Sequence, residues 1–189
     1  TLDTIRQRPL SMQIATDSDD RKKLALEAAK QLKDQSGPRV AVFDLDGFDT
    51  HAAQGGVDGA HADELEEVNK IVTILHENLG QAFDNTLILT LTEFGRTIKQ
   101  NGGYGTEHGY GSAILMAGGL LKKSQVYTEW PGLKKKELFE GRDLNSTIDS
   151  RAVYNSAMSV CFNQDPEFLR KEVFWGDELP DLSQELFKI

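Results

Sequence analysis

The sequence predicts an α/β fold with a mostly parallel, doubly wound sheet and helices on both faces. Apolar runs typical of buried strands lie at residues 40–43, 86–92 and 113–117. Segments with helical periodicity flank these runs along the chain. In a sheet of this class, binding sites lie outside the carboxyl ends of the strands, and functional residues are expected there.

The first helix is expected at residues 18–35. Asp17 or Ser18 provides an N-cap, and Gly37 followed by Pro38 ends the helix. The next apolar run, residues 40–43, predicts a central strand covered on both faces and ending at residues 44–47. After a long polar loop, apolar residues recur at spacings of three and four and predict a second helix: Leu65, Val68, Val72, Leu75, Leu79 and Phe83.

The second strand is expected at residues 86–92, where the run TLILTLT is apolar and β-branched. Residues 101–111 contain five glycines and predict a surface loop before the third strand at residues 113–117. Asp149 begins a helix that runs to Phe162, and Pro166 opens another short helix. The tail after Trp175 is expected to be irregular.

Composition limits the classes of function. A chain of 189 residues predicts a single α/β domain over residues 1–189. The net charge of −9 disfavours nucleic acid as a partner, and no stretch approaches the roughly 20 apolar residues that span a bilayer. The single cysteine, Cys161, lies in an apolar run and is expected in the core. Because the chain opens at Thr1 without a leader pattern, we expect it to be part of a longer protein.

Four residues at expected strand ends predict a divalent-metal site. Asp49 and His51 follow the first strand, Glu93 follows the second, and His108 lies in the glycine-rich loop. Two imidazoles with one or two carboxylates suit zinc, manganese or iron. The structural alternative is that these side chains only close turns, as Asp49 would in an Asx-type turn, or are solvated loop residues.

Arg96 follows Glu93 closely and has two candidate roles. It can pair with that carboxylate or bind a substrate anion such as phosphate or sulfate. His61 and His76 lie on or near the second helix, and we assign them to packing or surface positions rather than to the metal site.

A competing motif overlaps the same region. Phe43 to Gly47 reads FDLDG, as in haloacid-dehalogenase-type phosphatases, where Asp44 would be the nucleophile. Thr92 and the acidic residues Asp177 and Asp181 would then supply later motifs. The bulky Phe48 after the glycine argues against this interpretation, which also leaves the GFDTH and GTEHG stretches unexplained.

A family resemblance explains those stretches. The segments GFDTHAAQGG (47–56), LTEFGRTIKQNGG (91–103), GTEHGYGSAILMAGG (105–119), VYTEWPGL (126–133) and GRDL (141–144) occur in this order. Together they resemble the bacterial domain-of-unknown-function family 1501, related to alkaline phosphatases and sulfatases. The resemblance implies a protein about twice this length. It also implies export to the periplasm, often behind a twin-arginine signal, with this chain as the C-terminal half.

The resemblance also implies roles for individual residues. Asp49 and His51 match the first group of metal ligands, and His108 matches the last. The middle group is an acidic residue followed by histidine in the superfamily, whereas this sequence has Glu93 followed by Phe94. The nucleophile would come from the N-terminal half of the same protein. The implied activity is metal-dependent hydrolysis of an anionic phosphate or sulfate ester. The alternative is a non-catalytic exported domain that binds its partner on a retired hydrolase fold.

Overall fold

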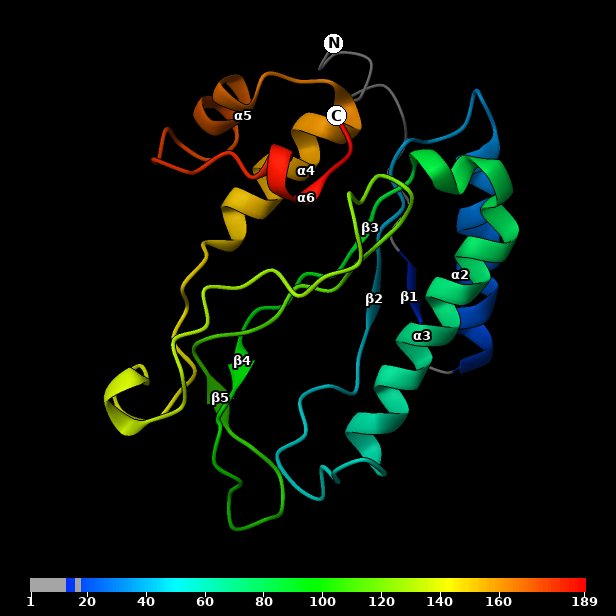
Figure 1. Cartoon of the computed structure of the whole chain (residues 1–189). Helices are drawn as coiled ribbons and strands as arrows, with labels where there is room; N and C mark the ends of the chain where they lie inside the picture. Colours follow the sequence, from blue (N-terminus) through cyan, green and yellow to red (C-terminus); the bar gives the residue numbers. More distant parts are fainter. Residues whose placement is uncertain (1–12, 16–17) are drawn as a thin grey trace. The chain divides into compact units, whose positions relative to one another are not determined.

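The computed structural model describes residues 13–15 and 18–189, and these residues fall into two compact units. Unit 1 contains the described residues up to Phe83 together with Gly103–Gly105. Unit 2 contains Asp84–Gly102 and Thr106–Ile189. Figure 1 labels most of the helices and strands of the two units.

Unit 1 alternates strands and helices: β1 (Gln13–Ala15), α2 (Ser18–Lys33), β2 (Phe43–Leu45) and α3 (Ala60–Leu79). β1 and β2 pair in parallel, as a strand–helix–strand crossover requires. α2 and α3 lie side by side (Figure 1). Small side chains on α2 allow close approach to the larger apolar ones on α3, and the buried apolar residues are Ala25, Ala28, Ala29, Ile71, Leu75 and Leu79.

The strand predicted from the run at 40–43 is present and ends within the expected residues 44–47, but its start and the burial of its first residues were wrong. β2 begins only at Phe43, and Val40 and Val42 are each 45% exposed. The ladder between β1 and β2 starts at Phe43, so the preceding residues lie outside it. An apolar run favours burial, but the neighbouring elements decide whether anything covers it.

Unit 2 contains two short antiparallel strand pairs. β3 (Ile88–Leu89) pairs with β6 (Met116–Ala117), and β4 (Gly95–Arg96) pairs with β5 (His108–Gly109). The expected strands at 86–92 and 113–117 are therefore present in shortened form, and the glycine-rich loop contains a strand of its own. Within the described part of the chain only β1 and β2 are parallel, so the doubly wound sheet stays a prediction.

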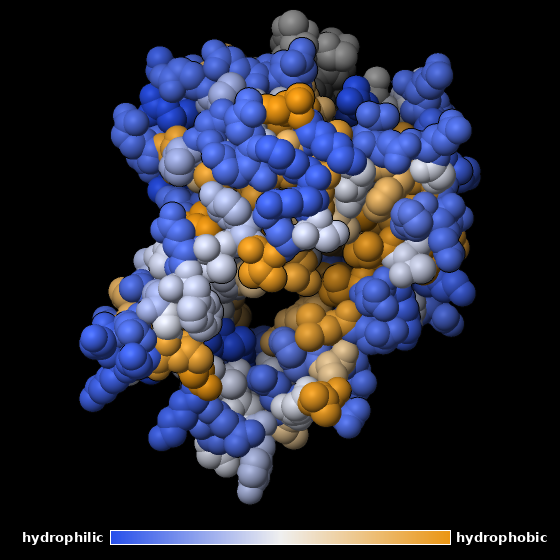
Figure 2. Space-filling view, viewed as in Figure 1, coloured by the Kyte–Doolittle hydropathy of each residue, from blue (hydrophilic) through white to orange (hydrophobic). Residues whose placement is uncertain are grey.

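The chain passes from unit 1 to unit 2 within a 3₁₀ turn at Gly80–Asn85, which follows α3. Helices complete unit 2, where a second 3₁₀ turn lies at Lys135–Glu137. α4 (Ser150–Phe162) begins after the N-cap Asp149, and α5 (Pro166–Glu172) has proline in its first turn, so both expected helix starts are confirmed. Figure 2 shows mostly hydrophilic residues over α5 on the face drawn. None of the described helices is both long and apolar enough to cross a membrane.

The tail after Trp175 is not irregular throughout, because α6 (Ser183–Leu186) forms within it. Three side chains of the tail, Leu182, Leu186 and Phe187, are buried against Ala152, Val153 and Ala157 of α4. Four residues of helical sequence carry little periodicity, so the sequence alone does not reveal such an element. Cys161, expected in the core, is only half-buried.

Candidate metal centre

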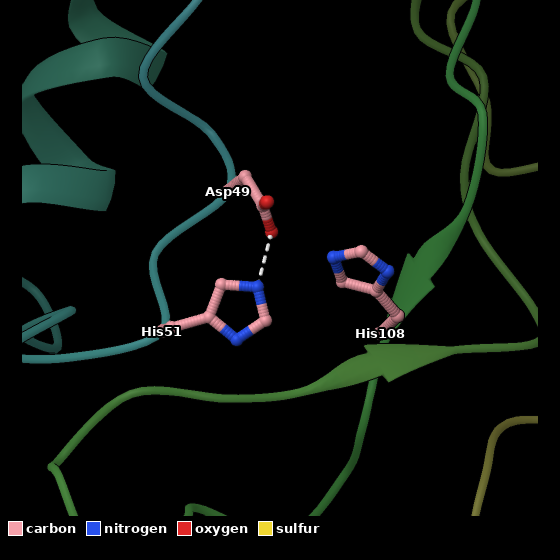
Figure 3. A group of neighbouring side chains, drawn as sticks. All are labelled: Asp49, His51 and His108. Atoms are coloured by element: carbon pink, nitrogen blue, oxygen red, sulfur yellow. Dashed lines mark ion pairs between the residues drawn. The ribbon is translucent and has the colours of Figure 1, made fainter.

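The loop after β2 carries the first two candidate ligands. An oxygen of Asp49 lies 3.0 Å from Nε2 of His51, and the two side chains are about half exposed (Figure 3). The backbone N–H of Thr50 donates to the carbonyl of Phe48 at 3.0 Å and tightens the loop between them. A separation of 3.0 Å suits a hydrogen bond, and it also suits two ligands of one metal ion.

The far end of this loop is held by residues distant in sequence. The N–H groups of Ala53 and Gln54 donate to the carbonyls of Gly103 and Tyr104, both at 2.9 Å. Gly105 then packs on the backbone of His51 so closely that a Cβ at this position would overlap the His51 carbonyl group. Glycine is required here because two backbones meet. All these residues belong to unit 1.

His108 belongs to unit 2 and lies on β5. It is opposite Arg96 in the β4–β5 register, and Gly95 is opposite Gly109. The pair continues past its end, where the N–H of Thr97 donates to the Glu107 carbonyl at 3.0 Å. His108 is an exposed residue.

Phe94 stacks on His108. The two ring centroids are 3.7 Å apart and the rings are 14° from parallel. In the sequence, Phe94 stood out only because the resemblance implies a histidine at this position. The structure adds that the phenyl ring contacts a candidate ligand and restricts the orientation of its imidazole.

Arg96 forms hydrogen bonds with the segment before β5. Its Nε donates to the hydroxyl of Thr106 at 2.9 Å, and its Nη2 donates to the Thr106 carbonyl. These bonds tie β4 to the chain entering β5. The role of Arg96 as an anion-binding residue stays a prediction, and so does the role of Glu93, which is exposed just before β4.

The two histidines assigned to packing both make aromatic contacts in unit 1. His61 meets Phe48 edge to face with centroids 5.8 Å apart, and His76 meets Phe83 at 4.6 Å. These contacts fit the expected structural roles of both histidines.

The haloacid-dehalogenase interpretation gains little from the geometry. Asp44 lies inside β2, where it is paired with Ile14, rather than just beyond the strand end. Asp46, the second aspartate of the motif, is paired with the guanidinium of Arg21 at 2.5 Å.

Comparison with known families gives one match. A family model described as "Protein of unknown function (DUF1501)" matches residues 12–171. No curated protein and no solved structure matches the chain.

Proposed function

The chain belongs to the DUF1501 family, and on that premise we propose that Asp49, His51 and His108 are the protein ligands of a divalent-metal site. The observation that carries the proposal is the closeness of their ligand atoms, one from each residue, which all lie within 4.8 Å of one another. Ligand bonds of about 2 Å place the donor atoms of one ion roughly 3–4 Å apart. Small side-chain rotations are therefore enough to bind an ion.

Chain connectivity supports the same grouping. Gly105 packs on His51 within unit 1, and His108 follows only three residues later. Three extended residues span at most about 10–11 Å. The backbone of His108 is thus tethered to the neighbourhood of the loop that carries Asp49 and His51.

The donor set is consistent with a catalytic type of centre. Two imidazoles and a carboxylate suit zinc or manganese, and three protein ligands leave a coordination position for water or substrate. When bound, a divalent ion would polarise an ester oxygen and lower the pKa of a bound water. Glu93 was expected as a further ligand, but its carboxylate is not part of the close group, and we propose a centre of three protein ligands.

We infer phosphate or sulfate ester hydrolysis as the activity, from the resemblance to alkaline phosphatases and sulfatases. The nucleophile would come from the N-terminal half of the protein, and the whole would act after export to the periplasm. One observation favours a second function. Phe94 occupies the position of a ligand histidine, as expected if the site binds an anionic partner without catalysis.

A metal-binding titration of purified protein tests the site. Cobalt, whose absorption reports ligand number, and zinc, measured by elemental analysis, are the probes. We expect His51→Ala and His108→Ala each to abolish stoichiometric binding, because either change leaves two ligands. His76→Ala is the matched control, since this histidine packs on Phe83. Metal retained unchanged in His51→Ala would refute the proposed site.

A further inference from the structure

Arg21 is a buried cation at the start of α2. Only 5% of the residue is exposed, which is unusual for an arginine in the first turn of a helix. Its Nη1 donates to Glu64 of α3 at 2.5 Å. Its Nη2 donates to Asp46 twice, to the carboxylate at 2.5 Å and to the backbone carbonyl at 3.2 Å.

These bonds connect three segments of unit 1. Arg21 lies on α2, Glu64 lies on α3, and Asp46 begins the loop that carries Asp49 and His51. The bond to the Asp46 carbonyl matters most, because it restrains the backbone itself rather than a flexible side chain. Asp49 is only three residues further along.

Glu64 also contacts this loop. Gly47 has φ of +91°, and a Cβ there would lie 2.6 Å from the Glu64 carboxyl carbon. The Glu64 side chain therefore packs directly against the loop backbone, while Arg21 holds that side chain in place. The start of the loop is thus contacted by one ion-paired cluster.

The cluster is electrostatically strong. Burial alone would lower the pKa of Arg21, but the hydrogen bonds that Arg21 donates to Glu64 and Asp46, together with the charges of these carboxylates, outweigh it and raise that pKa above its ordinary value. If one carboxylate were removed, the buried charge of Arg21 would be stabilised by only one partner. The three side chains therefore depend on one another.

We propose that Arg21 is the positioning residue of the metal site, holding the loop at Asp46 so that Asp49 and His51 keep the spacing that a metal ion requires. This inference rests on the proposed metal site. The loop is then restrained at both ends, by Arg21 before the ligands and by the pairing with Gly103 and Tyr104 after them. Preorganised ligands bind more tightly because less conformational entropy is lost on binding.

The test compares Arg21→Met with a variant that destabilises the same unit elsewhere. Leu75→Ala removes a buried side chain of α3 that lies far along the helix from the loop, and it is the matched control for lost stability. Cobalt affinity and thermal unfolding are measured for both, with binding measured well below each melting temperature. Arg21→Lys and Glu64→Gln are included, because both keep the polar cluster partly paired.

We expect Arg21→Met to lower cobalt affinity about tenfold or more, the scale of changes in groups that orient ligands. Arg21→Lys should be intermediate, since an ammonium can pair with one carboxylate but cannot bridge the cluster as a guanidinium does. Leu75→Ala should have a lower melting temperature than the parent protein but the same affinity for cobalt. Equal affinity in Arg21→Met, Arg21→Lys and the parent would overturn the proposal, as would equal losses in Leu75→Ala and Arg21→Met. If Arg21→Met does not fold, unchanged affinity in both Arg21→Lys and Glu64→Gln overturns it.

A readout without metal separates this inference from the metal site itself. Amide hydrogen exchange of residues 46–51 is measured in chelator for the same variants. Faster exchange in Arg21→Met than in Leu75→Ala, at matched global stability, supports the positioning role even if the parent protein binds no metal. Unchanged exchange in this loop would refute the positioning role of Arg21. The metal site itself would then still be tested separately by the metal titration.

Discussion

At the scale of single residues, the contact between Phe94 and His108 is the feature with the clearest consequence for binding. A stacked phenyl ring fixes an imidazole plane but donates no electron pair to a metal. Phe94 therefore restrains the candidate ligand His108 but could not itself bind a metal ion.

Replacing Phe94 tests this conclusion. Phe94→His should strengthen zinc binding about tenfold or more, because a new imidazole would be added beside His108. Phe94→Leu is the control, since it removes the aromatic ring without adding a ligand, and it should bind zinc no better than the parent protein. Competition with a chromophoric chelator measures both. If the histidine and leucine variants bind equally, Phe94 does not face the site.

At the scale of elements, unit 2 depends on helices whose ends are capped by side chains. The Asp149 carboxylate accepts the N–H of Arg151 at 2.9 Å at the start of α4, and Asp165 accepts the N–H of Glu167 at 3.0 Å at the start of α5. Both caps could be predicted from sequence, because they depend on residues two positions apart. The caps fix where each helix begins, and α4 carries half of the core of unit 2.

Removing the Asp149 cap should destabilise unit 2. Asp149→Ala is expected to lower the free energy of unfolding by roughly 0.5–2 kcal/mol, whereas Asp149→Asn retains the acceptor and should lose less. Urea unfolding followed by circular dichroism measures both. A loss in Asp149→Asn as large as in Asp149→Ala would assign the effect to charge rather than to the cap.

The same residue predicts a pH dependence. Hydrogen bonds from the Arg151 side chain are the main cause that lowers the pKa of Asp149 below its ordinary value of 3.8. A lowered folded-state pKa means that the stabilisation is complete above the unfolded-state pKa and is lost as pH falls through the folded-state value. Between pH 6 and about pH 3, the parent protein should therefore lose more stability than Asp149→Asn. Parallel pH profiles of the two proteins would contradict this.

At the scale of the whole molecule, each unit is closed by residues far apart in sequence. In unit 2, the N–H of Lys122 donates to the carbonyl of Leu186, and the N–H of Lys188 donates to the carbonyl of Leu120, both at 2.9 Å. These bonds place Phe187, which is 1% exposed, against α4. Phe187, close to the C-terminal end of the sequence, is therefore part of the core.

Phe187→Ala should cost about 3–5 kcal/mol of unfolding free energy, the range for buried aromatic residues. Ile189→Ala is the matched control, because Ile189 is 71% exposed two residues later and should change stability little. Hydrogen exchange locates the effect, which we expect as lost protection of α4 in unit 2. A small loss in Phe187→Ala would mean that the tail does not complete this core.

The sequence by itself determined what depends on near neighbours. It located α2, α3, α4 and α5 to within a few residues, because apolar periodicity and caps are local properties of the chain. It also singled out four candidate ligands, because acidic and histidine side chains beside glycines in predicted loops stand out from a core pattern. Asp49, His51 and His108 form a close group, which does not include the fourth, Glu93. The family model matches residues 12–171, a range that contains these motifs.

The tertiary structure decided everything that depends on contacts across long separations. Arg21 looks like an ordinary charged helix residue in sequence, and only the approach of Asp46 and Glu64 buries it. The antiparallel pairing of β4 with β5 and the packing of Gly105 on His51 likewise follow from which backbones meet. Val40 and Val42 show the reverse case, since their apolar run predicted burial and no neighbouring element of the described chain covers them. The local pattern of residues indicates which secondary structure a segment favours. Its burial and its pairing with other segments depend on the free energy of the whole chain.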